Sequence, residues 1–392
     1  YPFQLSGGQR QRILIAMAMA LEPRLLIADE PTTALDVTTQ AQILKLIKEL
    51  QRKHGIGVLF ITHDFGVVAD IADQVVVMRE GQVVECGSVE EVLNHPRDAY
   101  TRALIDAVPR LRRAHDQPEP IRPPLLQING VSKRYSSAGL GLFGKRSVTR
   151  ALDDVSLTIG QGETVGLVGE SGSGKTTLGQ CVVRLLDIDQ GQIQFDGQRI
   201  DQLRGAALKA LRPKIQMIFQ DPFASLNPRH RVGRIIMENV ILCGVAPREA
   251  QRRMDDVLRL VGLDASVAGR FPHEFSGGQR QRVGIARALV MQPQLIVADE
   301  AVSALDVSVQ QQVLALLRDV RDRLGLSRLF ITHDLRVASQ ICDRIAVMQK
   351  GRIVEVGAVA AIAGAPEHPY TRSLFDAMPG QAWERRSELI AA

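Results

Sequence analysis

Residues Gly169-Glu-Ser-Gly-Ser-Gly-Lys-Thr176 form a glycine-rich stretch that matches the pattern G-x-x-x-x-G-K-[ST]. An apolar run, Thr164–Val168, precedes this stretch, and a helix-forming segment, residues 177–186, follows it. Such glycines let backbone N–H groups curl around phosphate oxygens, and the N-terminus of the following helix favours negative charge. The stretch therefore predicts a phosphate-binding loop between a strand and a helix, which is typical of an α/β fold with a mostly parallel core sheet.

Two carboxylates follow another apolar run, Leu295–Ala298. Such a run suits a parallel strand that is buried on both faces, so Asp299 and Glu300 should lie at the carboxyl edge of the sheet. We expect Thr176 and Asp299 to hold Mg²⁺, and Lys175 to reach the β- and γ-phosphates of a nucleotide. Glu300 is placed to polarise an attacking water. A strand-end acidic pair is often only a solvated turn, and it is the phosphate loop that favours the functional interpretation.

Two further polar side chains end apolar runs. His333 follows Arg328–Thr332, and Gln220 ends another such run. A lone histidine at a strand end is more often a core or loop residue, but His63 lies at the same spacing after Glu30. The sequence therefore predicts that His333 senses the γ-phosphate and orients the water, and that Gln220 touches both Mg²⁺ and the water.

Two copies of one sequence occur in the chain at a constant offset of 270 residues. For example, Leu5–Arg12 (Leu-Ser-Gly-Gly-Gln-Arg-Gln-Arg) recurs as Phe275–Arg282 (Phe-Ser-Gly-Gly-Gln-Arg-Gln-Arg). Tyr1 matches Phe271, whereas the second copy begins near residue 125, so about 146 residues of the second copy have no counterpart in the first. Because the phosphate loop is among them, we expect the chain to be an N-terminally incomplete piece of a tandem protein.

The predicted organisation is a partial first domain over residues 1–108, a proline-rich linker over 109–124, a complete second domain over 125–380 and a tail over 381–392. Within the second domain, we expect residues 125–164 to form an antiparallel β-subdomain and residues from about 201 to 275 to form a helical insert.

Composition excludes several classes of protein. The net charge is only +5 and aromatic residues make up 4%, which argues against nucleic-acid binding. The four cysteines have no CxxC spacing, which argues against structural zinc and against a disulfide framework. No apolar run reaches the roughly 18 residues that a membrane-spanning helix needs.

The sequence Ser-Gly-Gly-Gln in a phosphate-loop domain, together with Gln220, Asp299-Glu300 and His333, resembles the nucleotide-binding domain of ABC ATPases. Finer features, Gln220–Pro228 (Gln-Asp-Pro-Phe-Ala-Ser-Leu-Asn-Pro) and the terminal His368-Pro-Tyr-Thr-Arg372, are similar to the ATP-binding subunits of bacterial oligopeptide and dipeptide importers. Two copies in one chain resemble the fused members of that family, which serve uptake of glutathione or microcin-type peptides.

In that family, ATP is sandwiched between two domains, and the phosphate loop of each meets the Ser-Gly-Gly-Gln signature of the other. The resemblance therefore implies one complete site, made by the second copy's loop and by the first copy's signature with Asp36. The reciprocal site would lack a phosphate loop. The nucleotide-binding residues that the resemblance implies are Tyr135 (stacking on adenine), Gly169, Glu170, Ser171, Gly172, Ser173, Gly174, Lys175, Thr176, Thr177, Gln220, Asp299, Ser6, Gly7, Gly8, Gln9, Ser276, Gly277, Gly278 and Gln279.

The resemblance also implies ATP hydrolysis, with Glu300 and His333 as catalytic residues and Thr176, Gln220 and Asp299 at Mg²⁺. The implied partners are two separate transmembrane permease subunits and a periplasmic or extracellular solute-binding protein, which places the chain on the cytoplasmic face of the inner membrane. No iron–sulfur cluster is expected, because no cysteine follows Cys342. The solute stays open among dipeptides, longer peptides, glutathione and nickel complexes.

Two other functions share these motifs. One is a soluble tandem ABC ATPase that acts on ribosomes or DNA, and the other is a non-hydrolysing regulatory fragment. The short linker, the lack of metal-ligand cysteine spacing, and the Tyr-Thr-Arg elements at Tyr100 and Tyr370 favour the importer. Ala301 replaces the first copy's Pro31, from which we infer no loss of activity.

Overall fold

A computed structural model describes residues 1–32, 35–109, 111, 122–137, 147–303 and 305–383. The chain divides into two compact units. Unit 1 comprises residues 1–110, 306–308 and 369–392, and unit 2 comprises residues 111–305 and 309–368. Most of the expected linker, much of the insertion after Tyr135, and residues 384–392 of the expected tail lie outside the described residues.

The core of unit 2 is a six-stranded sheet in the order β10-β11-β12-β7-β13-β14. Its strands are β7 (Thr164–Val168), β10 (Ile215–Ile218), β11 (Leu295–Asp299), β12 (Ser327–Thr332), β13 (Arg344–Gln349) and β14 (Arg352–Ala358). All neighbours pair in parallel except β13 and β14, which form an antiparallel pair. Every residue of β7, β11 and β12 is buried, as the continuous apolar runs predict.

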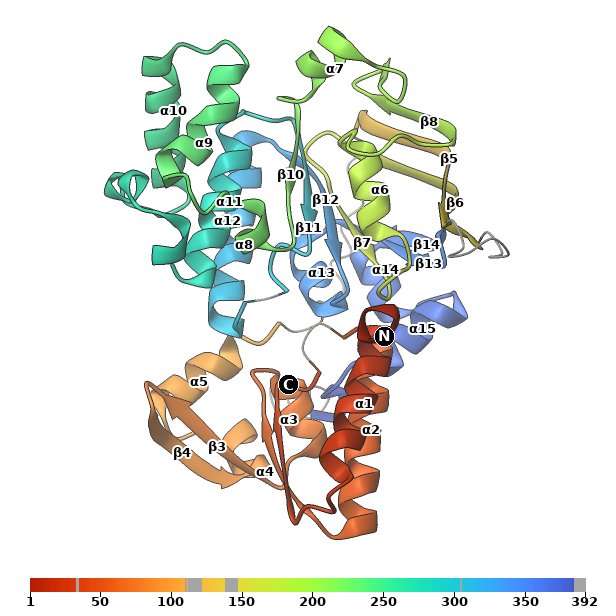
Figure 1. The fold of residues 1–392 in the computed structure, drawn as a ribbon, viewed down its shortest axis with the longest axis vertical. Helices are drawn as coiled ribbons and strands as arrows, with labels where there is room; N and C mark the ends of the chain where they lie inside the picture. Colours follow the sequence, from red (N-terminus) through yellow and green to blue (C-terminus); the bar gives the residue numbers. More distant parts are fainter. Residues whose placement is uncertain (33–34, 110, 112–121, 138–146, 304, 384–392) are drawn as a thin grey trace. The chain divides into compact units, whose positions relative to one another are not determined.

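A second, antiparallel sheet of unit 2 has the order β6-β5-β8-β9. Its strands are β5 (Pro124–Ser137), β6 (Ser147–Gly160), β8 (Gln190–Phe195) and β9 (Gln198–Arg199). It extends beyond the expected residues 125–164, because β8 pairs with β5 from a distant part of the chain. Helix α6 (Lys175–Val182) lies between this sheet and the core sheet (Figure 1), and its Leu178 and Val182 belong to one cluster with residues of both.

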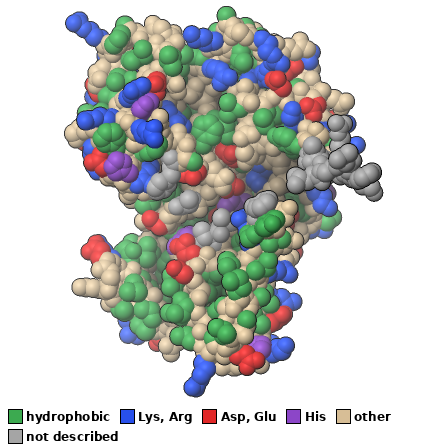
Figure 2. All heavy atoms as spheres, in the orientation of Figure 1, with side chains coloured by type: hydrophobic (Ala, Val, Ile, Leu, Met, Phe, Trp, Pro, Cys, Tyr) green, Lys and Arg blue, Asp and Glu red, His purple; other side chains and the backbone are tan. Residues whose placement is uncertain are grey.

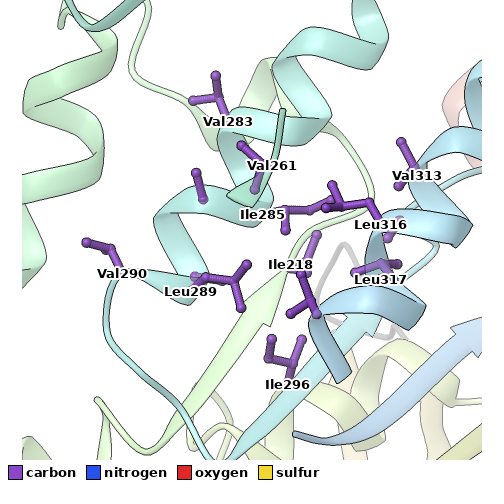
Figure 3. Close-up of a cluster of buried hydrophobic side chains, with 14 of the residues drawn as sticks. Ile218, Val261, Val283, Ile285, Leu289, Val290, Ile296, Val313, Leu316 and Leu317 are labelled. Carbon is purple, nitrogen blue, oxygen red and sulfur yellow. The ribbon is translucent and has the colours of Figure 1, made fainter. Parts of the chain in front are cut away.

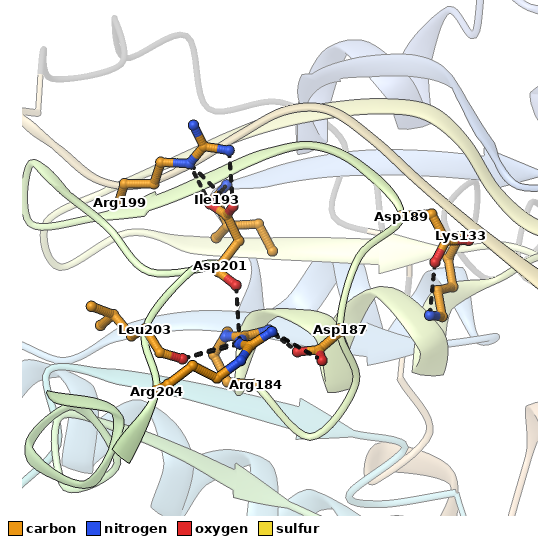
Figure 4. Close-up of polar contacts among 9 residues, drawn as sticks. All are labelled: Lys133, Arg184, Asp187, Asp189, Ile193, Arg199, Asp201, Leu203 and Arg204. Atoms are coloured by element: carbon orange, nitrogen blue, oxygen red, sulfur yellow. Dashed lines mark hydrogen bonds and ion pairs between the residues drawn. The ribbon is translucent and has the colours of Figure 1, made fainter. Parts of the chain in front are cut away.

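Charged contacts secure the segment between α6 and α7 (Gly205–Leu211) (Figure 4). Asp201 accepts hydrogen bonds from the Ile193 amide and the Arg199 guanidinium, and these bonds hold the pKa of Asp201 below its usual range although burial opposes them. Buried Arg184 pairs with Asp187 at 2.8 Å. These contacts fix the chain where it leaves the antiparallel sheet.

Helices cover the other face of the core sheet. The helices on this side are α8 (Pro222–Ser225), α9 (Val232–Leu242), α10 (Pro247–Leu260), α11 (Gly277–Leu289) and α12 (Val307–Leu324). Two 3₁₀ turns, Ala265–Gly269 and Pro272–Glu274, lie between α10 and α11 in the sequence. Helix α13 (Leu335–Ile341) follows β12, and α14 (Val359–Gly364) follows β14. Apolar side chains of α11 and α12 pack on β10 and β11 (Figure 3), and residues of α9 belong to the same cluster. Strand β10 thus lies within residues 201–275, where the sequence predicts a helical insert, and α8–α10 follow it.

Unit 1 has, in the same order, the elements that the second sequence copy has from residue 272 onward. They are the 3₁₀ turn Pro2–Gln4, α1 (Gly7–Met19), β1 (Leu25–Asp29), α2 (Val37–His54), β2 (Gly57–Ile61), α3 (Phe65–Ile71), β3 (Gln74–Arg79), β4 (Gln82–Ser88), α4 (Val89–Asn94) and α5 (Ala99–Asp106). The unit also includes α15 (Pro369–Asp376), which packs against α2. Beyond α15, the Gly380 amide donates to Asp70 (2.9 Å) and the Trp383 indole to Asn94 (3.1 Å).

The strands of unit 1 form two separate pairs, parallel β1-β2 and antiparallel β3-β4. In unit 2 the corresponding pairs, β11-β12 and β13-β14, are joined through β7. In unit 2, residues of α6 such as Leu178 and Val182 pack on these strands. The described part of unit 1 has no counterpart of α6, so apolar residues of unit 1 are exposed where their counterparts are buried, and hydrophobic side chains reach the surface of this unit (Figure 2). The exposed residues are Leu25 (55%), Ile27 (61%), Leu59 (51%) and Ile61 (45%), whereas Leu295, Val297, Leu329 and Ile331 are each 0% exposed.

The matched isoleucines give a direct test. Ile331→Ala should lower the free energy of unfolding of unit 2 by about 2–5 kcal/mol, because it removes buried methyl groups and leaves a cavity. Ile61→Ala should lower that of unit 1 by less than about 1 kcal/mol. Urea titration followed by segment-resolved hydrogen exchange separates the two units, and equal losses at both positions would contradict the difference in burial.

Candidate functional site

The glycine-rich stretch forms a loop between β7 and α6, as its flanking sequence predicts. Gly174 precedes α6 with φ of 107°, and a Cβ at this position would lie 2.3 Å from the Ala151 carbonyl oxygen. Only glycine therefore fits there. Lys175 is 5% exposed, and its Nζ donates to the carbonyl oxygens of Gly169 (2.7 Å) and Glu170 (2.8 Å) across the loop.

The loop has the donors that a phosphate group requires. The Ser173 hydroxyl oxygen is buried without a hydrogen-bond partner within the described part of the chain, and the Lys175 ammonium group is confined beside the loop backbone. Ser171, Gly172 and Thr176 are exposed, while Glu170 and Thr177 are half-buried. A phosphate at the N-terminus of α6 would satisfy both the orphaned hydroxyl and the lysine charge, so these residues fit a nucleotide phosphate.

Asp299 lies at the carboxyl end of β11, beside the loop. The Thr176 hydroxyl donates to its Oδ1 at 3.1 Å. Burial raises the pKa of Asp299 to about 6; the Thr176 hydrogen bond opposes this rise and the neighbouring charge of Glu300 adds to it. A hydroxyl and a carboxylate at this distance form a donor set that suits a hard cation such as Mg²⁺.

Glu300 is held by its backbone and by two side chains. Its φ is 45°, a left-handed conformation that costs about 1–3 kcal/mol in a non-glycine residue. Gln220 Nε2 donates to its Oε2 at 2.8 Å, and His333 Nδ1 lies 3.5 Å from its Oε1. Burial tends to raise the pKa of Glu300, but the hydrogen bond and charge of His333, with Lys175, bring it below its usual range.

The pKa of His333 shifts in the opposite direction. Burial tends to lower it, but the hydrogen bond and the charge of Glu300 outweigh burial and raise it. Asp334 accepts hydrogen bonds from the amides of Arg336 and Val337 and so caps α13 directly after the histidine. The structure therefore brings Lys175, Thr176, Asp299, Glu300, His333 and Gln220 together at one edge of the sheet.

The two Ser-Gly-Gly-Gln sequences begin helices α1 and α11 with the same capping box. Ser276 Oγ accepts from the Gln279 amide while Gln279 Oε1 accepts from the Ser276 amide, and Ser6 and Gln9 repeat this arrangement. A Cβ at Gly278 would lie 2.4 Å from a methyl group of Val309, so this glycine allows α11 to approach α12 closely. Gly8 has the same relation to Thr39 in unit 1, and Gly7 and Gly277 lie on the same first turns.

Some predicted residues are not joined to this edge. Tyr135 pairs with Thr149 in the antiparallel sheet and is 42% exposed. Ser6–Gln9 and Asp36, which caps α2 through the Thr39 amide, belong to unit 1.

Sequence reasoning missed two supporting residues. Ser303 donates to the Glu300 carbonyl oxygen at 3.1 Å and helps to hold the left-handed backbone there. Asp334 fixes the helix that begins after His333. Asp334 could have been found from the sequence, because an Asp directly before a helix is a common N-cap. Ser303 could not, because its contact depends on the fold of the turn.

Comparison with known proteins agrees with this geometry. The ABC transporter family model matches residues 1–33 and 152–303, and the model of the oligopeptide/dipeptide transporter C-terminal region matches residues 84–137 and 354–391. The chain is 50% identical to the glutathione import ATP-binding protein GsiA of Salmonella paratyphi A, and the alignment covers 97% of the chain. The chain belongs to the ABC transporter ATP-binding proteins.

Other relatives of this ABC protein have the same name. It is 48% identical to GsiA of Pectobacterium atrosepticum and 50% identical to GsiA of Escherichia coli O6:H1, in each case over 97% of the chain. The chain spans about 65% of the length of these curated relatives.

Solved structures support the fold. The ATP-binding cassette MJ0796, in a dimeric post-hydrolysis state bound to ADP and Pi, is 28% identical and matches with a TM-score of 0.54 over 60% of this chain and 99% of that one. CbiO1 from Clostridium perfringens, described as part of the ABC transporter complex CbiONQ, is 26% identical with a TM-score of 0.56 over 69% of this chain and 100% of that one. Within the described residues, no helix of this ABC protein is long and apolar enough to span a membrane.

The pKa of Asp299 gives a testable pH dependence. Because its pKa in the folded chain, about 6, exceeds the usual 3.8, ionisation of Asp299 destabilises the fold as the pH rises through this range. Asp299→Asn should therefore raise the free energy of unfolding at pH 7.5 by up to about 3 kcal/mol, and by little near pH 4. Urea titration in EDTA at both pH values measures the difference.

The matched control is Asp29→Asn in β1. Asp29 is exposed, so this change should alter stability by less than about 0.5 kcal/mol at either pH. A loss of stability in Asp299→Asn at pH 7.5 would contradict the electrostatic account of this carboxyl group.

Proposed function

We propose that the chain hydrolyses ATP in order to energise import of peptides or related small solutes through separate membrane subunits. The observation that carries the proposal is the convergence of Lys175, Thr176, Asp299, Glu300 and His333 at the edge where the phosphate loop opens. Such an edge can bind a nucleotide triphosphate, hold a metal ion and position a water.

In this mechanism Lys175 exchanges its two loop carbonyls for β- and γ-phosphate oxygens, and the loop amides surround the phosphates. Thr176 and Asp299, with Gln220, hold Mg²⁺, which neutralises phosphate charge when it is bound. Glu300, kept ionised by its lowered pKa, accepts a hydrogen bond and then a proton from the attacking water. His333, fixed by the Asp334 cap, orients Glu300 and the γ-phosphate.

The second half of the site comes from the other copy. We place Ser6–Gln9, at the N-terminus of α1, against the γ-phosphate held at Lys175, with Asp36 beside it and the Tyr135 ring on the adenine. Ser276–Gln279 would serve a reciprocal site whose phosphate loop would come from a segment that pairs with β2 and β3, as β7 pairs with β12 and β13. The exposed apolar residues of β1 and β2 support this organisation.

Import is supported by the relatives, which are named glutathione import ATP-binding protein. We propose that two transmembrane permease subunits and a periplasmic or extracellular solute-binding protein complete the transporter. The chain would then lie on the cytoplasmic face of the inner membrane, bound through the helical insert and the segment after Gln220. Match of the oligopeptide/dipeptide transporter C-terminal region in both copies favours this over action on ribosomes or DNA.

Nucleotide stoichiometry tests the asymmetry between the two sites. A chain carrying Glu300→Gln should bind one ATP per molecule in the presence of Mg²⁺, because the only phosphate-loop motif of its sequence is at 169–176. Isothermal titration calorimetry gives the number, and Lys175→Ala should abolish the binding. A value of two ATP per closed chain would contradict the proposal.

Hydrolysis tests the role of Glu300. Glu300→Gln should bind ATP but lower kcat by about 10²–10⁴-fold, because the group that accepts the proton from water is lost. Glu30→Gln, the matched change in unit 1, should leave kcat within about twofold. Unchanged hydrolysis in Glu300→Gln would refute the assigned role.

Cross-linking this ATP-trapped variant in its native cell identifies the partners. Polytopic permease subunits in the product would support import. Ribosomal proteins, rRNA or DNA in the product, without membrane proteins, would support the soluble alternative and overturn the import proposal.

A further inference from the structure

Arg287 lies in the last turn of α11, the helix that begins with Ser276. Its Nη1 donates to the Ser225 carbonyl oxygen at 2.5 Å, and its guanidinium lies 5.8 Å from the centre of the Phe219 ring. The guanidinium lies within the range of a cation–π contact, and the bond to Ser225 is a short hydrogen bond from a charged donor. Arg287 therefore contacts the chain on both sides of Gln220, one residue before it and five residues after it.

The segment from Gln220 to Ser225 is short, and hydrogen bonds fix both of its ends. Asp221 accepts from the Ala224 amide at 3.1 Å and thereby caps the single turn of α8, whose last carbonyl is the one that receives Arg287. At the other end, Gln220 follows Phe219 and donates to Glu300 at 2.8 Å. The position of Gln220 is thus set between the buried strand β10 and a turn whose C-terminal end is held by Arg287.

The contact with Ser225 matters because the arginine is desolvated. Burial lowers the pKa of Arg287, and within the described residues no carboxylate pairs with it. Arg287 is half-buried, and a partly desolvated charge that no carboxylate neutralises relies on the polar groups that it reaches. Loss of the Ser225 carbonyl would therefore leave this charge less well compensated. The turn after Gln220 and the end of α11 are therefore expected to move together.

We propose that Arg287 is a positioning residue that sets Gln220 against Glu300 and so links the Ser276–Gln279 helix to catalysis at the Lys175 site. The inference rests on the proposed ATP hydrolysis. It applies to one copy only, because Met17, at the matching position of α1, is 65% exposed and uncharged. The two copies therefore differ here: in the second copy an arginine of the signature helix contacts the segment around Gln220, and the first copy has no arginine at the matching position.

Kinetics of the full chain test the role. Arg287→Met should lower kcat for ATP by about tenfold or more, the effect of one lost charge-assisted hydrogen bond, while KM for ATP stays within about twofold. Arg287→Lys, which can still donate to the carbonyl, should restore most of kcat. The change should not add to Gln220→Ala, so the double variant should equal Gln220→Ala alone. Multiplicative effects in the double variant would overturn the proposal.

Hydrogen exchange supplies a second readout that needs no hydrolysis. Amides of residues 219–226 should exchange about tenfold or more faster in Arg287→Met than in the unaltered chain. The control is Arg282→Met, because Arg282 lies on the same helix but donates to Val261 and Gln312, and it should leave this segment unchanged. Equal exchange in all three chains would overturn the inference, even if the unaltered chain hydrolyses ATP.

The two hypotheses fail separately. If the unaltered chain neither binds nor hydrolyses ATP, the proposed function fails. Faster exchange of residues 219–226 in Arg287→Met alone would then still support the positioning of this segment by Arg287, and unchanged exchange would refute it.

Discussion

Parallel pairing of β11, β12 and β7 is the constraint on which the site depends. The register places Asp299 opposite Ile331 and Thr332 opposite Val168, so the three strands end at the same level. The strand register alone therefore brings together the residues that follow the strands, which are Glu300, His333 and the phosphate loop. Strands β7, β11 and β12 are buried on both faces. A slip of register would therefore be costly, because it would move every side chain of a strand to the other face of the sheet.

Two successive carboxylates at this edge are in different electrostatic environments. Burial raises the pKa of Asp299, whereas at Glu300 burial is outweighed by the combined hydrogen bond and charge of His333 with the charge of Lys175, and the pKa falls. A cation that replaces the Thr176 hydrogen bond would remove the unfavourable burial of the Asp299 charge, so metal binding and ionisation are coupled there. Glu300 is ready to act as a carboxylate before any ligand arrives. The end of β11 thus carries Asp299, whose charge a bound cation would stabilise, next to Glu300, whose charge His333 and Lys175 already stabilise.

Much of this site could be predicted because local sequence determines it. The phosphate loop, the acidic pair and His333 each follow an apolar run. The repeat at an offset of 270 residues also identifies the acidic pair and the histidine a second time, as Asp29-Glu30 and His63. Contacts between distant segments could not be predicted, since they depend on packing. Arg287 meets Ser225 only after α11 packs on α8, β8 joins β5 only through the register of the antiparallel sheet, and Glu300 adopts its left-handed backbone only within a folded turn. The roles of Tyr135 and of the Ser6–Gln9 signature stay predictions.

The segment after α15 carries the single tryptophan of the chain, Trp383, whose indole N–H donates to Asn94 in unit 1. Indole emission changes in wavelength and intensity when its hydrogen bond and its surroundings change. Since no other tryptophan contributes, the tryptophan emission of the whole chain comes from this one location. The protein therefore carries its own optical reporter of whether the C-terminal segment is seated on α4, and it reads that event without an attached dye.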